Sequence, residues 1–310
     1  MDKLPFIAII LTIGIETAEC IHSNLCNLPN VTCSEQDLVK IYWDLNGLHQ
    51  EDPQLIEAIQ KHILVPPNSE LVPLSLSHQP TKNMLNGQFG QVEIIEDLLM
   101  MKKKGFFIEA GAGCGEKLSN TLYLEIAHQW TGLLIEPNPD LLKALYSKHR
   151  NGWIFPHCLS PTPYVQTIRF EASSYLSGII LEGKPKPSQM GSHFNADHKQ
   201  ENGKEIQVQC FPLYSVLKAM GNPPIDYFSL DIEGAEFAVL NTIPWKDVTI
   251  TAVGVEINHA GDIFDGNRYD IGRLLEKNGF KYVGTAWIDD FFLSKKYLQT
   301  LTIESNKNET

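Results

Sequence analysis

Short apolar runs alternate with stretches of helical periodicity from residue 105 onward, and this alternation limits the fold more than any other feature. Strands that alternate with helices form a mostly parallel sheet with helices on both faces. The last two runs, KYVGTAWI and FFLSKK, follow each other without a helix and predict an antiparallel hairpin. The expected strands are FFIEA, GLLIEP, WIFPHCL, DYFSLDI and TAVGVEI, followed in turn by helices over 116–129, 138–149, 212–220, 234–241 and 267–278. We therefore predict an α/β protein with a doubly wound sheet.

The N-terminus has the pattern of a signal peptide over residues 1–20. Its apolar run, LPFIAIILTIGI, has about the length of a signal-peptide core and is shorter than the roughly 20 residues that span a membrane. Cleavage is expected after Ala18 or Cys20, and a retained signal anchor over residues 4–15 is the alternative. We expect a protein of the secretory pathway (endoplasmic reticulum, Golgi or endosome) or a secreted one, with membrane association only through this segment.

Two sequons agree with a location in the secretory pathway. Asn30 in NVT and Asn308 in NET each fit the N-glycan acceptor pattern, which predicts a glycoprotein. Cys26 and Cys33 lie in one short loop, where an oxidising lumen would allow them to pair. Cys114 lies inside a glycine-rich loop, where we interpret it as a small residue that fits the turn.

The chain divides into a helical extension over 21–84, a main domain over 85–298 and a tail over 299–310. Within the extension, SEQDLVKIYW and DPQLIEAIQKHIL predict helices, the second capped by Asp52. A further helix is expected over GQVEIIEDLLMMKKK. The polar stretch 182–205 is read as a long loop, and loops of that length are often lids or binding loops.

The segment FFIEAGAGCGEKLSNTLYLE predicts a ligand site. In open α/β sheets, ligands bind beyond the carboxyl ends of the strands. Gly111, Gly113 and Gly115 follow a strand that ends near Glu109, and glycine permits a tight turn and close approach of backbone to ligand. A glutamate stands where the dinucleotide fingerprint needs its third glycine, which disfavours NAD and FAD. Glu136 ends the next strand, at the offset of a carboxylate that binds a ribose diol.

A second group of acids follows the strand IDYFSL. Asp231, Glu233 and Glu236 lie within six residues, and Glu256 and His259 end the next strand, so we expect all five to lie close together. Crowded carboxylates raise one another's pKa, which suits a general base. We name Asp231, Glu233, Glu256 and His259 as catalytic candidates. The alternative is that Asp231 and Glu233 only cap the following helix.

A metal site is less well supported. The loop segment HFNADH carries His193, Asp197 and His198, but in a polar loop these residues are more often solvated. We therefore assign no metal from the sequence.

The three blocks FFIEAGAGCGEKLSNTLYLE, WTGLLIEPNP and IDYFSLDIEGAEFAVLNTIPW resemble the FkbM-type methyltransferase domain over about residues 85–295. The resemblance implies a class I, Rossmann-like fold and O-methyl transfer from S-adenosyl-L-methionine. It places Glu236 on the substrate side and implies these cofactor contacts: Glu109, Gly111, Gly113, Gly115, Asn120 and Glu136.

The sequences LSNTLYLE and GLLIEP most resemble the arthropod Star-like branch of that family. This likeness implies a different role, in endoplasmic reticulum-to-Golgi and endosomal, vesicle-mediated transport of growth-factor precursors that regulate EGF receptor signalling. Star is held by a membrane anchor, whereas the apolar run here has a cleavable pattern.

The net charge of −12 argues against nucleic acid as the main partner, because phosphate binding needs surplus lysine and arginine. Two functions remain. The first is a methyltransferase that acts on a small-molecule or glycan acceptor. The second is a non-catalytic factor that binds a secretory cargo protein.

Overall fold

The computed structural model describes residues 45–67, 72–77, 87, 90–173, 176–190 and 203–308. The predicted signal peptide, the helix expected over 34–43, Asn30 and the HFNADH segment lie outside these residues. Within the described part, no helix has both the length and the apolar character needed to cross a bilayer.

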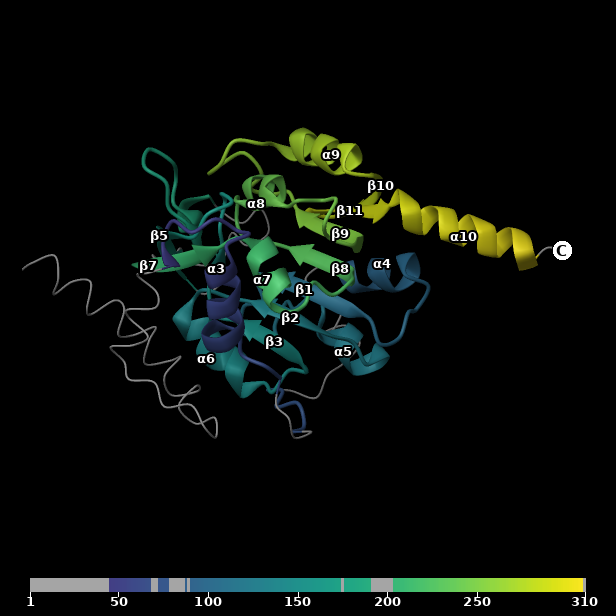
Figure 1. The fold of residues 1–310 in the computed structure, drawn as a ribbon, viewed down its shortest axis with the longest axis horizontal. Helices are drawn as coiled ribbons and strands as arrows, with labels where there is room; N and C mark the ends of the chain where they lie inside the picture. The colour runs from purple at the N-terminus through teal and green to yellow at the C-terminus, as the bar shows by residue number, and fades with distance from the viewer. Residues whose placement is uncertain are drawn as a thin grey trace, which may run out of the picture.

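A seven-stranded sheet lies at the centre of the described part, in the order β10-β11-β9-β8-β1-β2-β3 (Figure 1). Strands β1, β2, β3, β8 and β9 pair in parallel, while β11 is antiparallel to both neighbours. The bounds are β1 Phe106–Ala110, β2 Thr131–Ile135, β3 Gly152–Phe155, β8 Ile225–Leu230, β9 Ile250–Glu256, β10 Phe280–Ala286 and β11 Asp289–Ser294. This confirms the doubly wound, class I Rossmann-like sheet with its C-terminal hairpin.

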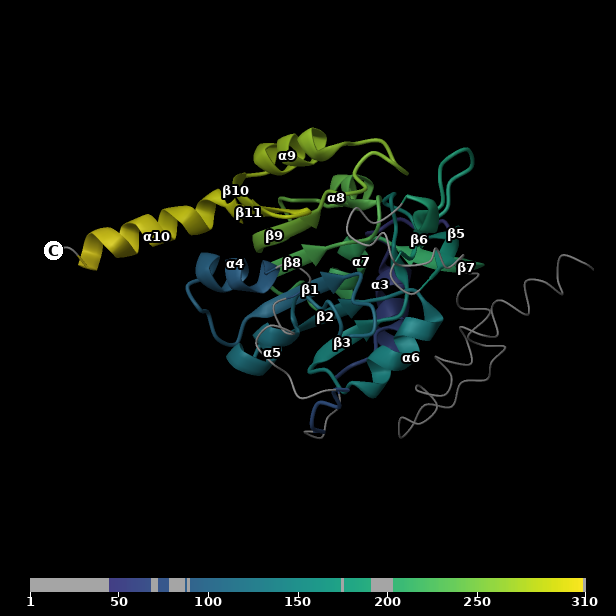
Figure 2. The same ribbon diagram turned by 180° about the vertical axis from the view of Figure 1, so that it is seen from behind.

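Helices cover both faces of the sheet (Figures 1 and 2). One buried core joins α3, η1, α7, α8 and α9 to the sheet, and a second core on the other face joins α4, α5 and α6. Asp52 caps α3 and Pro53 fills its first turn, as predicted. The bounds are α3 Pro53–Ala58, η1 Ile59–Ile63, α4 Gln91–Leu98, α5 Leu122–His128, α6 Pro139–Ser147, α7 Leu213–Ala219, α8 Glu236–Thr242 and α9 Arg268–Lys277.

A second sheet, which the sequence analysis missed, has the order β4-β7-β5-β6. The run WIFPHCL was expected to form one strand, but it divides at Pro156, which has no backbone N–H for a ladder, and its second half enters this sheet. The expected loop 182–205 contains the short helix η3 and ends inside β7. The bounds are β4 Cys158–Leu159, β5 Gln166–Ala172, β6 Gly178–Ile179, β7 Lys204–Phe211 and η3 Pro187–Gln189.

A disulfide joins Cys158 of β4 to Cys210 of β7, which are paired residues in the register of the two strands. The bond therefore cross-links two neighbouring strands of the second sheet. Cys114 is free and half-buried.

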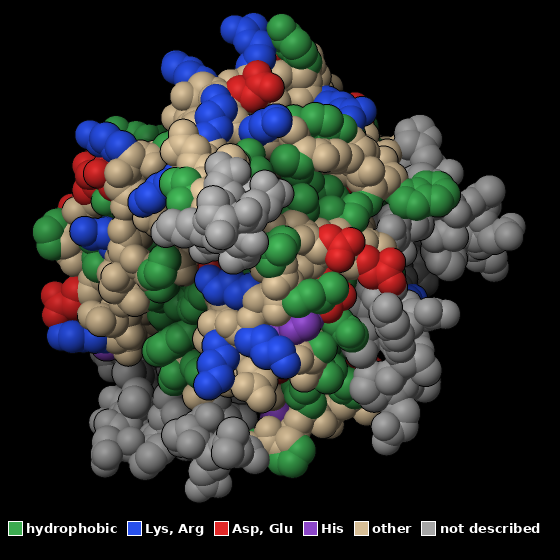
Figure 3. Space-filling view, turned by 90° about the vertical axis from the view of Figure 1, so that its right-hand side faces the viewer, with side chains coloured by type: hydrophobic (Ala, Val, Ile, Leu, Met, Phe, Trp, Pro, Cys, Tyr) green, Lys and Arg blue, Asp and Glu red, His purple; other side chains and the backbone are tan. Residues whose placement is uncertain are grey.

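Several helix boundaries differ from expectation. The helix expected over GQVEIIEDLLMMKKK ends at Leu98, and Met100, Met101 and Lys104 beyond it have positive φ. The helix predicted over 116–129 begins only at Leu122, because residues 119–121 fold around a buried carboxylate instead. The residues assigned to a tail lie largely in α10 (Lys295–Asn308), which extends from the body of the molecule (Figure 1). On the face from which α10 extends, lysine and arginine side chains are interspersed with acidic and apolar ones (Figure 3).

Candidate active site

The order of strands reverses between β1 and β8, and the loops that follow these two strands meet there. Ala110 pairs with Leu230, so Gly111 and Asp231 leave the sheet side by side. The Asp231 N–H donates to the Ala110 carbonyl at 3.1 Å. A Cβ atom on residue 111 would collide with the Asp231 carbonyl oxygen, so only glycine fits this contact.

The other two glycines of the loop serve different purposes. All three have positive φ, but a Cβ on residue 115 would strike the side chain of Leu145, whereas a Cβ on residue 113 would meet nothing within 4 Å. Gly115 is therefore favoured by its positive φ and by the Leu145 side chain, which would have to shift to admit a Cβ. Gly113 borders open space, where its backbone is accessible to a ligand.

Glu136 follows β2 and connects this strand to the glycine loop. Its carboxylate accepts hydrogen bonds from the Gly113 N–H at 2.8 Å and the Asn138 N–H at 2.7 Å, and only 4% of the residue is exposed. Burial raises the pKa of Glu136 to about 7, against the lowering effect of these bonds. The structure thus places Glu136 beside the glycine loop, as the sequence indicated.

Glu109 lies near the end of β1, as predicted, but its carboxylate is bound within the protein. Its carboxylate points into the protein and accepts hydrogen bonds from Ser119 Oγ at 2.9 Å, the Asn120 N–H at 2.6 Å and Thr121 Oγ1 at 2.6 Å. Glu109 therefore organises residues 119–121. The Asn120 side chain is also held within the protein, because its Nδ2 donates to Ser229 Oγ at 3.1 Å.

Arg150 supports the same loop and was missed by the sequence analysis. Its guanidinium is buried and donates to Glu125 Oε2 at 2.7 Å, to the Gly115 carbonyl at 2.7 Å and to Thr121 Oγ1 at 3.0 Å. It also acts on Glu109, where its charge opposes the effect of burial on the pKa. An arginine just after a helix has no sequence signal that distinguishes it from a surface residue.

The predicted acids converge at the carboxyl ends of β8 and β9. Asp231, Glu236 and Glu256 each offer a carboxylate oxygen, and these oxygens lie within 4.8 Å of one another. Burial and the charges of neighbouring carboxylates raise the pKa of Asp231, Glu233 and Glu256 well above the usual range.

Glu236, rather than Asp231 or Glu233, holds the loop before α8. Its carboxylate accepts from the Ile232 N–H at 2.9 Å and the Gly234 N–H at 3.0 Å. The helix N-cap is Ala235, which makes no side-chain capping bond. The alternative in which Asp231 and Glu233 act as simple helix caps is therefore wrong.

His259 lies against this group and is 3% exposed. Its Nε2 is 3.5 Å from Glu233 Oε2 and 2.9 Å from Asn258 Nδ2, and its Nδ1 is 3.2 Å from Asp262 Oδ2. Glu233 itself has a positive φ of 58°, in the left-handed region that non-glycine residues rarely adopt. The structure thus brings together all four residues predicted to be catalytic.

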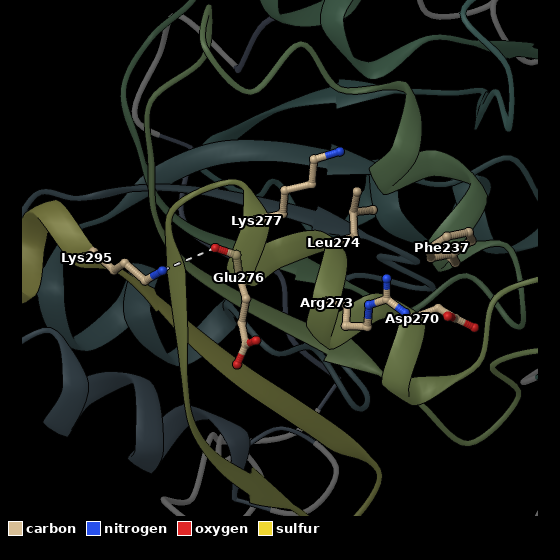
Figure 4. A pocket seen from close by; sticks show the side chains of 7 residues that line it. All are labelled: Phe237, Asp270, Arg273, Leu274, Glu276, Lys277 and Lys295. Atoms are coloured by element: carbon tan, nitrogen blue, oxygen red, sulfur yellow. Dashed lines mark hydrogen bonds between the residues drawn. The ribbon is translucent and has the colours of Figure 1, made fainter.

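A separate surface cavity of about 560 Å³ lies along α9, lined by residues of that helix together with Phe237 and Lys295 (Figure 4). Lys295 Nζ donates to the Glu276 carbonyl at 3.2 Å across its edge. The lining carries both acidic and basic side chains and includes none of the residues predicted from the sequence. The cavity is therefore distinct from the site at the strand ends.

Comparison with known proteins gives one family. The methyltransferase FkbM domain matches residues 109–282. This range includes the glycine loop, Glu136 and the acidic residues from Asp231 to Glu256. No curated protein matches the chain at a significant level.

Three solved structures share limited similarity with the chain. Two are phosphoethanolamine N-methyltransferase 2 of Haemonchus contortus, one with phosphomonomethylethanolamine and S-adenosylhomocysteine (TM-score 0.32, 8% identity) and one with S-adenosyl-L-methionine (0.33, 9%). The third is described as a pericyclic reaction enzyme (0.33, 12%). The matches cover 62%, 63% and 70% of this chain but only 38%, 39% and 50% of those structures.

Proposed function

This chain belongs to the methyltransferase FkbM domain family, and on that premise we propose that it is an S-adenosyl-L-methionine-dependent O-methyltransferase of the secretory pathway or the cell exterior. The observation that carries the proposal is the hydrogen bond from Gly113 to Glu136. It joins Gly113, in the loop after β1, to the carboxylate that follows β2, and β1 is one of the two strands between which the sheet order reverses.

The residues present fit this cofactor. Gly113 borders open space, and Glu136 has lone pairs left to accept hydrogen bonds from a ribose diol. The cofactor's sulfonium and ammonium groups are cationic, and the adjoining loop supplies the carboxylates of Asp231 and Glu233. When bound, S-adenosyl-L-methionine supplies an electrophilic methyl group. The protein's part is to hold the acceptor in line and remove its proton.

Glu233 is the best-placed base. Glu233 and Asp231 are partly exposed, whereas Glu236 and Glu256 are buried, and Glu233 also lies against His259. Burial and the charges of neighbouring carboxylates raise its pKa, so Glu233 is a stronger base than a solvated glutamate. His259, at 3.5 Å, orients the Glu233 carboxylate and is itself oriented by Asp262.

One feature of the described residues, a disulfide, supports the proposed location in the secretory pathway or outside the cell. The bond between Cys158 and Cys210 is of the kind that persists in oxidising environments such as the secretory lumen and the cell exterior. It agrees with the predicted signal peptide and sequons.

The test is a methyl-transfer assay with the full-length protein expressed through the secretory pathway. Sugars, glycans and small hydroxy and carboxylic acids are offered as acceptors, and S-adenosylhomocysteine formation is measured. We expect turnover that falls by about 100-fold in Glu233→Gln, with Glu205→Gln, an exposed carboxylate of β7, as the matched control. A folded protein that forms no product with any acceptor would contradict catalysis and favour the Star-like transport role.

A further inference from the structure

Three carboxylates from three elements converge beside the glycine loop. Asp231 follows β8, Glu236 lies in the first turn of α8, and Glu256 is the last residue of β9. One oxygen of each lies within 4.8 Å of the others. That spacing is compatible with three oxygens bound to one ion, because Ca²⁺–oxygen distances are about 2.3–2.6 Å.

Glu256 provides an independent sign of a ligand. The residue is 2% exposed, and its Oε1 accepts from the Asn258 N–H at 2.7 Å. Its Oε2 is buried and accepts no hydrogen bond from any residue that the structure describes. A buried carboxylate oxygen without a partner is costly, and such a group calls for a bound cation or a proton donor.

The surroundings of these carboxylates are acidic. The charged groups that act most strongly on Asp231 are Asp289, Glu236, Glu109 and Glu136, and those that act most strongly on Glu256 are Asp231, Glu236 and Glu233. Several negative groups held together in a water-poor site repel one another unless a positive charge joins them.

The carboxylates are also held in fixed positions. Glu236 is oriented by the N–H groups of Ile232 and Gly234, and Glu256 by that of Asn258. Backbone donors that fix a carboxylate in this way are typical of the outer shell of metal sites. Each carboxylate still has free lone pairs for an ion.

We propose that Asp231, Glu236 and Glu256 bind a hard divalent cation, namely Mg²⁺, Ca²⁺ or Mn²⁺. Such ions prefer carboxylate oxygens, and three carboxylates leave further coordination positions for water or a ligand oxygen. The site adjoins the glycine loop, because the Asp231 carbonyl contacts Gly111. If the proposed methyltransferase function holds, the cation would bind an oxygen of the methyl acceptor and lower its pKa, which favours acceptors with neighbouring oxygens.

Calorimetric titration tests the cation site directly. The full-length protein is freed of metal with EDTA, dialysed and titrated with MgCl₂, CaCl₂ or MnCl₂ in the absence of cofactor and acceptor. We expect a dissociation constant below about 1 mM for at least one ion. Glu256→Gln should weaken binding at least about 10-fold, and Glu276→Gln, which removes an exposed carboxylate of α9, should leave it unchanged.

Folding of the variants is checked by thermal unfolding in EDTA. Glu256→Gln removes one charge from a crowded group, so we expect it to melt at the wild-type temperature or above. Asp231→Asn, which alters another of the three proposed ligands, is titrated with the same ions as a second test of the cation site. No binding by the folded wild type, or equal binding by Glu256→Gln, overturns the cation site.

Binding of S-adenosyl-L-methionine is measured in parallel. Cofactor binding without cation binding would overturn only this inference, and cation binding without cofactor binding would contradict only the proposed function.

Discussion

The backbone carbonyl of Asp231 occupies the space that a Cβ atom on residue 111 would need. The loops after β1 and β8 therefore touch at a glycine, and this contact places the cofactor loop directly beside the acidic group. Any side chain at position 111 would separate the two halves of the site.

This contact predicts a contrast between two glycine variants. Gly111→Ala should lower the free energy of unfolding by about 2–4 kcal/mol, because the methyl group collides with backbone and φ is +86°. Gly113→Ala should cost about 1 kcal/mol, because φ is +54° but no atom lies within 4 Å of the new Cβ. Urea unfolding measures both. Equal losses would show that the Asp231 contact does not determine the requirement at position 111.

The buried guanidinium of Arg150 predicts a large loss of stability. Arg150→Met should lower the free energy of unfolding by about 3–5 kcal/mol, because it leaves Glu125 and Glu109 buried without their cation. Arg169→Met is the matched control, since its ion pair with Glu205 lies at the surface. Chemical denaturation of the two variants should separate them clearly. Similar midpoints would mean that Arg150 does not hold the loop together.

Glu136 predicts how stability depends on pH. Its pKa rises from 4.5 to about 7 on folding because of burial, so the folded state binds the extra proton between these values. The contribution of Glu136 is therefore complete below about pH 4.5 and is lost as the pH rises through about 7, a fall of up to about 3 kcal/mol. Unfolding of the ligand-free protein at about pH 5 and about pH 8 measures this slope, which Glu136→Gln should flatten. An unchanged slope in that variant would contradict the assignment.

The disulfide predicts a loss of stability on reduction. Cys158 and Cys210 are 52 residues apart, and closing a loop of that size stabilises the folded state by about 4 kcal/mol. The double variant Cys158→Ala/Cys210→Ala should lose about this amount and become insensitive to reductant. Cys114→Ser should behave like the wild type, because that thiol is free. Wild-type stability that does not change with reductant would argue against the bond and the oxidising compartment.

The sequence predicted the features that depend on local patterns. The alternation of strands and helices gives the central sheet, and the positions of Gly113 and Glu136 follow from where their strands end. The second sheet was missed because β5 and β7 pair across more than thirty residues, and only tertiary structure brings them together.

The candidate site likewise contains residues whose positions follow from local sequence patterns and residues whose roles depend on tertiary contacts. The convergence of Asp231, Glu233, Glu256 and His259 was predicted, because neighbouring parallel strands end at one edge. The role of Glu109 was not, because its partners at 119–121 belong to a segment with a helical pattern that the buried carboxylate draws out of the helix.

Calorimetric titration of the full-length protein, expressed through the secretory pathway, with S-adenosyl-L-methionine and S-adenosylhomocysteine most directly tests whether the glycine loop and Glu136 form a cofactor site. We expect micromolar binding that is unchanged in Glu276→Ala. In Glu136→Ala it should weaken about 10-fold or more, since hydrogen bonds to a charged acceptor contribute about 1.5–3 kcal/mol each. No binding by protein shown to be folded, or equal affinity in Glu136→Ala, would contradict the cofactor site.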